Sequence, residues 1–357
     1  MADFNREMLI LARESRGLTQ TELAEQGLFS QAEISKFETG VKIPTDEQVR
    51  GLASHLHYPQ EFFYANETVR DFGSGCVYHR RRKTSPEAKL KQLLMLVNLR
   101  RIHVKRLLTS VNTTSEFTFE ELAIDEFDGN AVCVAQALRA IWKIPPGPVQ
   151  NVVNIIESAG GIIVSCDFGT DKIDALSQWL PGLPPVFLVN SRIPTDRLRW
   201  TLVHEIGHIV MHRFPTDQME KEADQFTAEF LLPEEEVKKH LYDLSLPKLA
   251  QLKPYWRVSM NALLRRAGDL QTIAPRTKSY LWMQMGQRGY RTHEPVDIPP
   301  ETPSLLKDLL AVHREKLGYG TKELAQMLLL KESEVLTYYG DCLLGNSSRS
   351  GLRLVRQ

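Results

Sequence analysis

The chain has 357 residues, of which 42% are hydrophobic, and its 44 Lys and Arg balance 44 Asp and Glu. This length and composition are typical of a globular protein with two or three domains. The sequence has no basic start followed by an apolar stretch and no uninterrupted apolar run of about 18 residues, so it indicates neither a signal peptide nor a transmembrane helix. We therefore expect a cytoplasmic protein with no membrane partner.

The zero net charge hides an uneven distribution. Residues 1–70 carry 7 Lys and Arg against 11 Asp and Glu, whereas residues 71–110 carry 10 against 2. Attraction to nucleic acid would therefore depend on the second block. The cysteines are far apart and form no C-x-x-C pair, which argues against a disulfide framework and a thiolate zinc site. They are Cys76, Cys133, Cys166 and Cys342.

Short helices fill the first 65 residues. Apolar periodicity and breakers predict helices over residues 4–16, 19–25, 30–38 and 44–57. Thr19 and Ser30 are predicted N-cap residues, because their hydroxyls can accept hydrogen bonds from the first free backbone N–H groups. Gly27 and Gly40 supply the turns that end two of the helices.

The second and third of these helices have the spacing of a helix-turn-helix, which places the later helix in a DNA major groove. Gln20, before that helix, would contact phosphate, and the base-contacting residues would be Gln31, Ala32, Ser35 and Lys36. The inner face would consist of Leu23, Ala24, Ile34 and Phe37.

The alternative is a helical protein-interaction domain, which the acidic balance of residues 1–70 favours. DNA binding needs cations that neutralise phosphates. The segment "YHRRRK" (Tyr78–Lys83) and a basic connecting helix predicted from Ser85 to about Leu108 can supply them.

Beyond residue 130 the pattern becomes mixed. Helices are predicted over residues 130–142, 149–158, 195–212, 218–232 and 234–242, with two short helices within 246–270, the second capped by Ser259. The β-branched runs 161–166 and 185–190 and the alternating segment 174–180 predict three strands. The strand "PVFLVN" is a candidate edge for an extended substrate. The C-terminal third shows no interpretable motif, and no internal repeat is recognised.

The segment "RWTLVHEIGHIVMH" contains the pattern H-E-x-x-H. Residues four apart stack on one helix face about 6 Å from each other, so His204 and His208 can share one metal ion. In this arrangement two neutral imidazoles hold zinc, and Glu205 takes a proton from the water that the metal activates. Gly207 leaves room for another element to approach. The alternative is an ordinary amphipathic helix with histidines on its face.

A hydrolytic zinc needs a third protein ligand, and the next helix offers one. In "EKEADQF", Glu220 can bind the metal while Asp224, four residues later, holds a histidine from behind. Glu222 competes for the ligand role but faces about 200° around the helix from Glu220. The packed side of this helix should carry Ala223, Phe226, Phe230 and Leu231.

His212 continues the histidine row two turns beyond His204. The two are about 11 to 12 Å apart along the axis, so they cannot share one ion directly. His212 is therefore predicted to support a ligand, to act as a cation at the helix end or to contact substrate.

These motifs together resemble an XRE-family helix-turn-helix joined to an ImmA/IrrE-family metallopeptidase domain. The likeness covers about residues 5–65 and 130–235. It rests on "LTQTELAEQ" and "SQAEISKFETGVKIP", and on "PGPVQNVVNIIESAGGIIV", "IDALSQW", "PTDRLRWTLVHEIGHIVMH" and "EKEADQFTAEFLLP". The resemblance implies His204, His208 and Glu220 as zinc ligands and Glu205 as general base. One departure is Thr227, where the family usually has alanine.

The fold predicted is α+β, with an N-terminal all-α helix-turn-helix domain, a zincin-like metallopeptidase domain with a small sheet, and a mostly helical C-terminal region. The boundaries predicted are 1–66 for the DNA-binding domain, 67–115 for a basic loop and connecting helix, 116–242 for the zinc domain and 243–357 for a region of unknown role.

The function that the resemblance implies is a transcriptional regulator, binding operator DNA as a homodimer, whose zinc domain cleaves a repressor or antitoxin-like protein. Alternatively, the zinc domain cleaves the chain itself, with the basic loop 66–84 as a candidate cleavage site. Two alternatives remain open. One is a transcription factor whose metal domain is a non-catalytic sensor, and the other is an antitoxin-like or defence-system module that binds protein.

Overall fold

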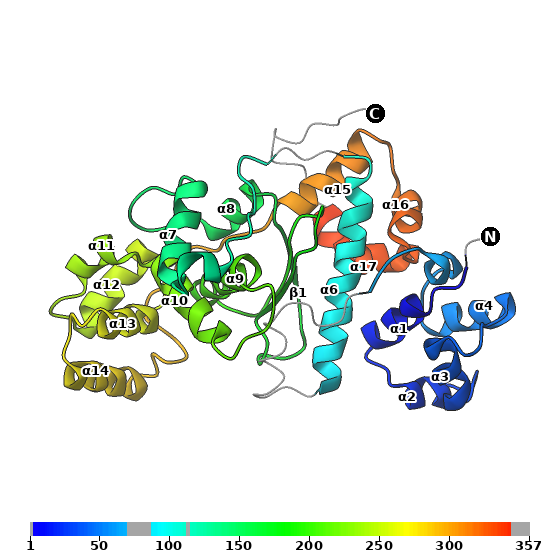
Figure 1. Ribbon diagram of the computed structural model, residues 1–357, viewed down its shortest axis with the longest axis horizontal. Coiled ribbons are helices and arrows are strands. Elements are labelled where there is room, and N and C mark those ends of the chain that lie inside the picture. Colours follow the sequence, from blue (N-terminus) through cyan, green and yellow to red (C-terminus); the bar gives the residue numbers. More distant parts are fainter. Residues whose placement is uncertain (1–2, 70–86, 112–114, 344–357) are drawn as a thin grey trace.

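The computed structural model describes residues 3–69, 87–111 and 115–343. The described part is mostly helical with one small sheet (Figure 1), which confirms the α+β prediction. Several predicted features lie outside the described residues, namely the segment Tyr78–Lys83, the helix start at Ser85 and Cys76.

The N-terminal helices follow their predicted caps. They are α1 (Arg6–Ser15), α2 (Gln20–Glu25), α3 (Gln31–Thr39), α4 (Asp46–His55) and the short 3₁₀ helix η1 (Gln60–Tyr64). Thr19 and Ser30 each form a capping box with the glutamate three residues later, and Gly40 ends α3 with a φ of 78°. Three predicted inner residues, Leu23, Ile34 and Phe37, are buried.

The connecting helix α6 (Glu87–Leu108) differs from the prediction of an amphipathic basic helix. It contacts α1, β2 and β3, and two helices from the C-terminal end of the chain. Arg100 and Arg101 are each only 4% exposed, and Lys105 and Arg106 form ion pairs with Glu67. The expectation that basic residues of this helix neutralise phosphates is therefore wrong for Arg100 and Arg101, which are buried, whereas the side chain of Lys105 is 45% exposed.

The sheet contains β1 (Ile162–Cys166), β2 (Ala175–Gln178) and β3 (Val186–Asn190) in the order β1-β3-β2. β3 pairs parallel with β1 and antiparallel with β2, and all five of its residues are buried. The prediction that "PVFLVN" forms an edge is therefore wrong. Its continuous apolar run reflects burial on both faces of a central strand. The edge strand β2 contacts the helix Thr195–Met211.

Two helices of the middle region, Val152–Ser158 and Thr195–Met211, contact that sheet directly, and most of the others pack on these two or on one another. In chain order, the helices of this region are η2 (Ile124–Phe127), α7 (Ala131–Ile141), α8 (Val152–Ser158), α9 (Thr195–Met211), α10 (Met219–Leu231), α11 (Glu234–Val237), η3 (Lys238–His240), α12 (Leu246–Trp256), α13 (Met260–Asp269) and α14 (Pro275–Gln287). α10 packs between α7 and α9 through its predicted apolar side. A Cβ on Gly207 would lie 3.0 Å from the ring of Phe226, so glycine permits this close approach.

The C-terminal helices α15 (Leu305–Glu315), α16 (Thr321–Leu328) and α17 (Glu332–Leu343) return to α6 (Figure 1). Glu157, at the end of α8, accepts hydrogen bonds from the backbone N–H groups of Ser304 and Leu305 and so fixes the start of α15. Like α1–α3, these three helices are joined by short connections.

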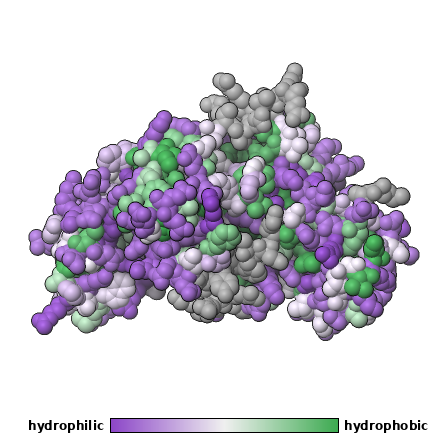
Figure 2. All heavy atoms as spheres, viewed as in Figure 1, coloured by the Kyte–Doolittle hydropathy of each residue, from purple (hydrophilic) through white to green (hydrophobic). Residues whose placement is uncertain are grey.

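Two hydrophobic cores support the molecule. One joins the N-terminal helices, α6, one face of the sheet and the C-terminal helices, and the other joins the opposite face of the sheet to α7–α14. The face seen in Figure 2 is mostly hydrophilic with small separate hydrophobic patches. Within the described residues, every helix is too short or too polar to span a bilayer.

Candidate metal centre

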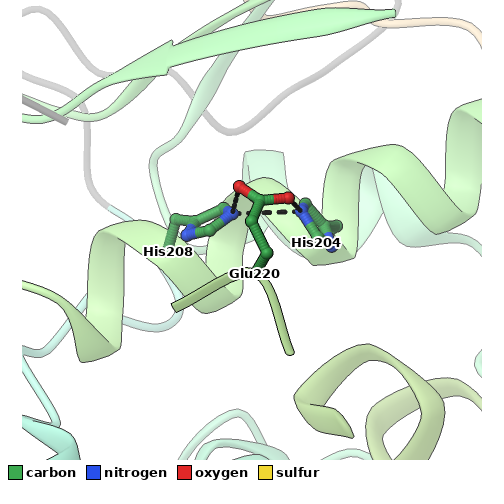
Figure 3. A group of neighbouring side chains, drawn as sticks. All are labelled: His204, His208 and Glu220. Atoms are coloured by element: carbon green, nitrogen blue, oxygen red, sulfur yellow. Dashed lines mark hydrogen bonds and ion pairs between the residues drawn. The ribbon is translucent and has the colours of Figure 1, made fainter. Parts of the chain in front are cut away.

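Two histidines of α9 and one glutamate of α10 converge at a single point (Figure 3). The Nε2 atoms of His204 and His208 lie 3.0 Å apart. Glu220 reaches between them, with Oε2 3.6 Å from His204 Nε2 and Oε1 3.4 Å from His208 Nε2. The potential ligand atoms of these three residues all lie within 4.8 Å of one another, so the group could hold one metal ion.

A second layer of side chains orients His204. Its Nδ1 lies 3.3 Å from Asp224 Oδ1, and Asp224 Oδ2 accepts a hydrogen bond of 2.9 Å from Arg265 on α13. Because Nδ1 faces a carboxylate, it carries the proton, and the Nε2 lone pair faces Glu220. The structure thus brings Asp224 behind the histidine, where the sequence placed it.

His208 is held by a chain of two further groups. Its Nδ1 lies 3.2 Å from Nδ1 of His212, whose Nε2 lies 3.0 Å from Glu222 Oε2. A proton on His212 Nε2 and another on His208 Nδ1 satisfy both contacts and leave the Nε2 lone pair of His208 facing the site. His212 therefore lies behind a ligand candidate, and Glu222, the competing ligand in the sequence, contacts His212.

Burial determines the charge state of the cluster. It lowers the pKa of His208 to about 4, so the imidazole is neutral near pH 7. Burial opposes ionisation of Glu220, but the contacts with His204 and His208 outweigh it and lower the pKa of that carboxyl. Two neutral imidazoles and one carboxylate form the ligand set that zinc prefers.

The cluster also has features that a cation would satisfy. Two nitrogen lone pairs face each other across 3.0 Å, and Glu220 Oε1 is buried without a hydrogen-bond donor. Zinc–nitrogen bonds of about 2.0–2.1 Å in a tetrahedron separate ligand atoms by roughly 3.3 Å, which is close to the spacing present here. The side chains therefore fit a bound zinc ion.

Glu205, the predicted general base, points away from solvent. Its side chain is fully buried, and Oε2 accepts a hydrogen bond of 2.8 Å from Ser177 Oγ on β2. Ser177 was not singled out from the sequence, although it lies within the quoted segment "IDALSQW". Its placement depends on the pairing of β2 with β3, and no local pattern encodes that pairing.

A cleft of about 970 Å³ lies beside the N-terminal half of α9. Trp200 and Thr201, one turn before His204, line one wall, and Arg265 of α13 lines another. Arg265 also contacts Asp224 and so links the cleft to the residue behind His204, although the three converging residues do not line the cleft.

The predicted DNA-contacting residues lie on one open surface of α2 and α3. Gln31, Ala32 and Lys36 are exposed, and Ser35 is half-buried. Gln31 Nε2 donates a 2.8 Å hydrogen bond to Gln20 Oε1, which links the two helices at the surface. The described structure therefore places these residues together on the outer face of α3, with Gln20 beside them.

Comparison with known protein families found one match in the N-terminal helices and one in the region of the histidine cluster. Residues 156–267 match the IrrE N-terminal-like domain of the peptidase M78 family, and residues 9–61 match a helix-turn-helix family. The two matches agree with the predicted fusion of an XRE-type helix-turn-helix with an ImmA/IrrE-family domain. A search among curated proteins found no significant match. The M78 match runs from α8 through nearly all of α13, and so includes both cluster helices and Arg265.

Proposed function

We propose that the chain is a DNA-binding transcriptional regulator whose ImmA/IrrE-type domain is a zinc-dependent endopeptidase that cleaves a repressor or antitoxin-like protein, or the chain itself. The convergence of His204, His208 and Glu220 supports the peptidase part most directly. The exposed face of α3 supports the regulatory part. The domain boundaries at residues 66, 115 and 242 remain part of this proposal.

The zinc ligands in this proposal are His204 and His208, through Nε2, and Glu220, through its carboxylate. Zinc would supply a Lewis acid that polarises a peptide carbonyl and activates water. Asp224 and His212 hold the two imidazoles in the required tautomer through the Nδ1 contacts. Both histidines then bind the metal without releasing a proton.

Glu205 is the proposed general base and acid. In that role its carboxylate takes a proton from the attacking water and returns it to the leaving amine. Ser177 fixes one oxygen of this carboxylate through the 2.8 Å hydrogen bond. The substrate carbonyl would approach through the cleft that shares Arg265 with the cluster.

The DNA-binding part is proposed to act on a double-stranded operator as a homodimer, because two symmetric recognition helices match a palindromic site. Gln31, Ala32, Ser35 and Lys36 would contact base edges, and Gln20 would contact phosphate. Operator binding also places the chain in the cytoplasm, where the DNA lies.

One observation favours a second function, in which the metal domain is a non-catalytic sensor. Glu205 is fully buried and hydrogen-bonded, whereas a general base has to exchange protons with a water molecule at the metal. In a sensor, metal binding would change DNA affinity without any cleavage.

The two functions are separated by mapping new protein N-termini in cells that express the wild-type chain or Glu205→Gln, together with intact mass of the purified chains. The proposal predicts one or a few new N-termini that depend on Glu205, in a DNA-binding protein or in the chain itself. Identical N-terminal maps, combined with DNA affinity that changes on adding zinc, would establish the sensor function instead.

A further inference from the structure

The C-terminal helices repeat the N-terminal helix-turn-helix. Residues 6–40, the first unit, align without a gap with residues 307–341, the second unit. The identical pairs are Leu9 and Leu310, Arg13 and Arg314, Glu14 and Glu315, Gly17 and Gly318, Glu22 and Glu323, Leu23 and Leu324, Ala24 and Ala325, Leu28 and Leu329, and Glu33 and Glu334.

The backbone of the two units agrees around the turn between the first and second helices, whereas in the next turn the positive φ lies at Gly27 in the first unit and one aligned position later, at Leu329, in the second. Gly17 and Gly318, between the first and second helices, have φ values of 73° and 71°. Glu22 accepts a 2.7 Å hydrogen bond from the backbone N–H of Thr19, and Glu323 accepts one of 2.9 Å from Gly320. α15, α16 and α17 therefore correspond to α1, α2 and α3.

Packing within the second unit also follows the first. Leu324 and Val335, the equivalents of Leu23 and Ile34, are buried between α16 and α17. Such a pair fixes the angle between the two helices, so α17 occupies the position of a recognition helix.

The outer face of α17 is open. The positions that correspond to Gln31, Ala32, Ser35 and Lys36 carry Glu332, Ser333, Leu336 and Thr337, and all four are exposed. Their chemistry suits base edges, because a glutamate accepts from cytosine N4, hydroxyls bond to any base, and an apolar side chain contacts the thymine methyl group. Leu336 is 57% exposed although it is apolar, which leaves it available for such a contact.

The two units have similar net charges. Residues 307–341 carry 5 Lys and Arg against 6 Asp and Glu, and residues 6–40 carry 4 against 6. The second unit is thus no more acidic than the unit that matches a helix-turn-helix family.

The units are held together within the chain. Both contact α6, and Arg16 at the end of α1 forms a 2.6 Å ion pair with Glu334 and a 3.2 Å hydrogen bond with the hydroxyl of Tyr338 on α17. Figure 1 shows α16 and α17 next to the N-terminal helices. These contacts use the inner side of α17 and leave its outer face free of the first unit.

We propose that residues 305–343 are a second DNA-binding unit, which contacts the major groove through Glu332, Ser333, Leu336 and Thr337. Each chain then brings two recognition helices to DNA, and the specific site is longer than one helix-turn-helix would cover. The inference rests on the proposed DNA binding of the first unit.

The test compares variants that shift the net charge equally. Leu336→Glu/Thr337→Glu places two negative charges on α17, Lys36→Glu makes the same change of two on α3, and Lys239→Glu makes it on an exposed surface of the peptidase domain. Affinity and nuclease footprints are measured on duplex DNA that the wild-type chain selects from a random library. Thermal unfolding checks that each variant folds, as expected for exposed positions.

The proposal predicts that the α17 variant loses affinity about tenfold or more and loses one part of the footprint. Lys36→Glu should lose another part, and Lys239→Glu should bind like the wild type. If only Lys36→Glu weakens binding, the first unit binds DNA and the second does not, which would overturn the inference. If the wild type selects no DNA, both the inference and the proposed DNA binding are wrong.

Discussion

The histidine cluster on α9 and the recognition helix α3 are organised in opposite ways. His204 and His208 are nearly buried, and each is held at Nδ1 by a chain of side chains that ends in Arg265 or Glu222. On α3, Gln31 and Lys36 are exposed, and Gln31 has a surface partner in Gln20.

This difference agrees with what each ligand demands. A metal ion tolerates errors of only about 0.2 Å in its bond lengths, so its ligands need fixed positions and tautomers. Long, exposed side chains contact a DNA groove and become ordered only when the complex forms. Phosphate contacts provide much of the affinity. Substitutions at the cluster should therefore strongly reduce cleavage or zinc binding, whereas substitutions on α3 should reduce DNA affinity by a smaller factor.

The largest effect should come from Glu205→Gln. Removing a proton-transfer group should lower the cleavage rate of the identified substrate by about 10²–10⁴. Because Glu205 is not among the converging ligand atoms, zinc content should stay at the wild-type level. Single-turnover rates and elemental analysis of the same samples provide the check, and unchanged cleavage would show that Glu205 is not the base.

Acidification of the metal-free protein should be the next largest effect. Burial lowers the pKa of His208 from 6.5 to about 4, so between these values the unfolded chain binds the proton more readily than the folded chain. The free energy of unfolding should therefore fall as pH drops from about 6.5 to about 4, by up to roughly 3 kcal/mol from this residue.

Denaturant unfolding of wild type and His208→Gln across that range measures this contribution. The difference between the two proteins isolates His208 from the other buried groups, such as His212. Parallel pH curves would contradict the burial that lowers its pKa.

Substitutions behind the ligands should have intermediate effects. Asp224→Ala and Glu222→Ala each remove the carboxylate that orients a histidine, His204 directly and His208 through His212. Each should lower zinc affinity by about 10- to 100-fold. Competition with a fluorescent chelator measures this, with Glu235→Ala as an exposed control on α11. Wild-type affinity in both variants would mean that the imidazoles do not depend on these partners.

The smallest effect should come from Gln31→Ala. Loss of a base contact should weaken specific DNA binding by about tenfold and leave zinc content unchanged. Titration of the selected duplex at several salt concentrations separates the loss of a base contact from a loss of phosphate contacts, which would flatten the salt dependence. A loss of zinc in this variant would show that the two regions are coupled.

Local sequence patterns predicted the features that depend only on neighbouring residues, such as helix starts and the spacing of the two histidines. Thr19 and Ser30 fixed the starts of α2 and α3, and the spacing of His204 and His208 required only that α9 be a helix. Glu220 reaches the cluster because α10 packs on α9 through its apolar side, a contact that Gly207 permits.

The features that the sequence did not predict depend on contacts between residues far apart in the chain. Arg265 comes from a helix 41 residues after Asp224, and Ser177 from a strand whose position depends on its pairing with β3. The charges of α6 were expected at the surface, but neighbours from both ends of the chain cover that helix. The similarity of residues 307–341 to residues 6–40 was not predicted, because Gly320 and Lys331 stand where the first unit has the capping residues Thr19 and Ser30.

The most direct test of the central claim is the metal content of purified wild type, His204→Ala and Glu220→Ala by elemental analysis after zinc is supplied. The arrangement of the cluster predicts about one zinc ion per wild-type chain, and loss of that ion in both variants while each remains folded. A folded wild-type protein that binds no zinc, or two variants that keep it, would contradict the metal centre.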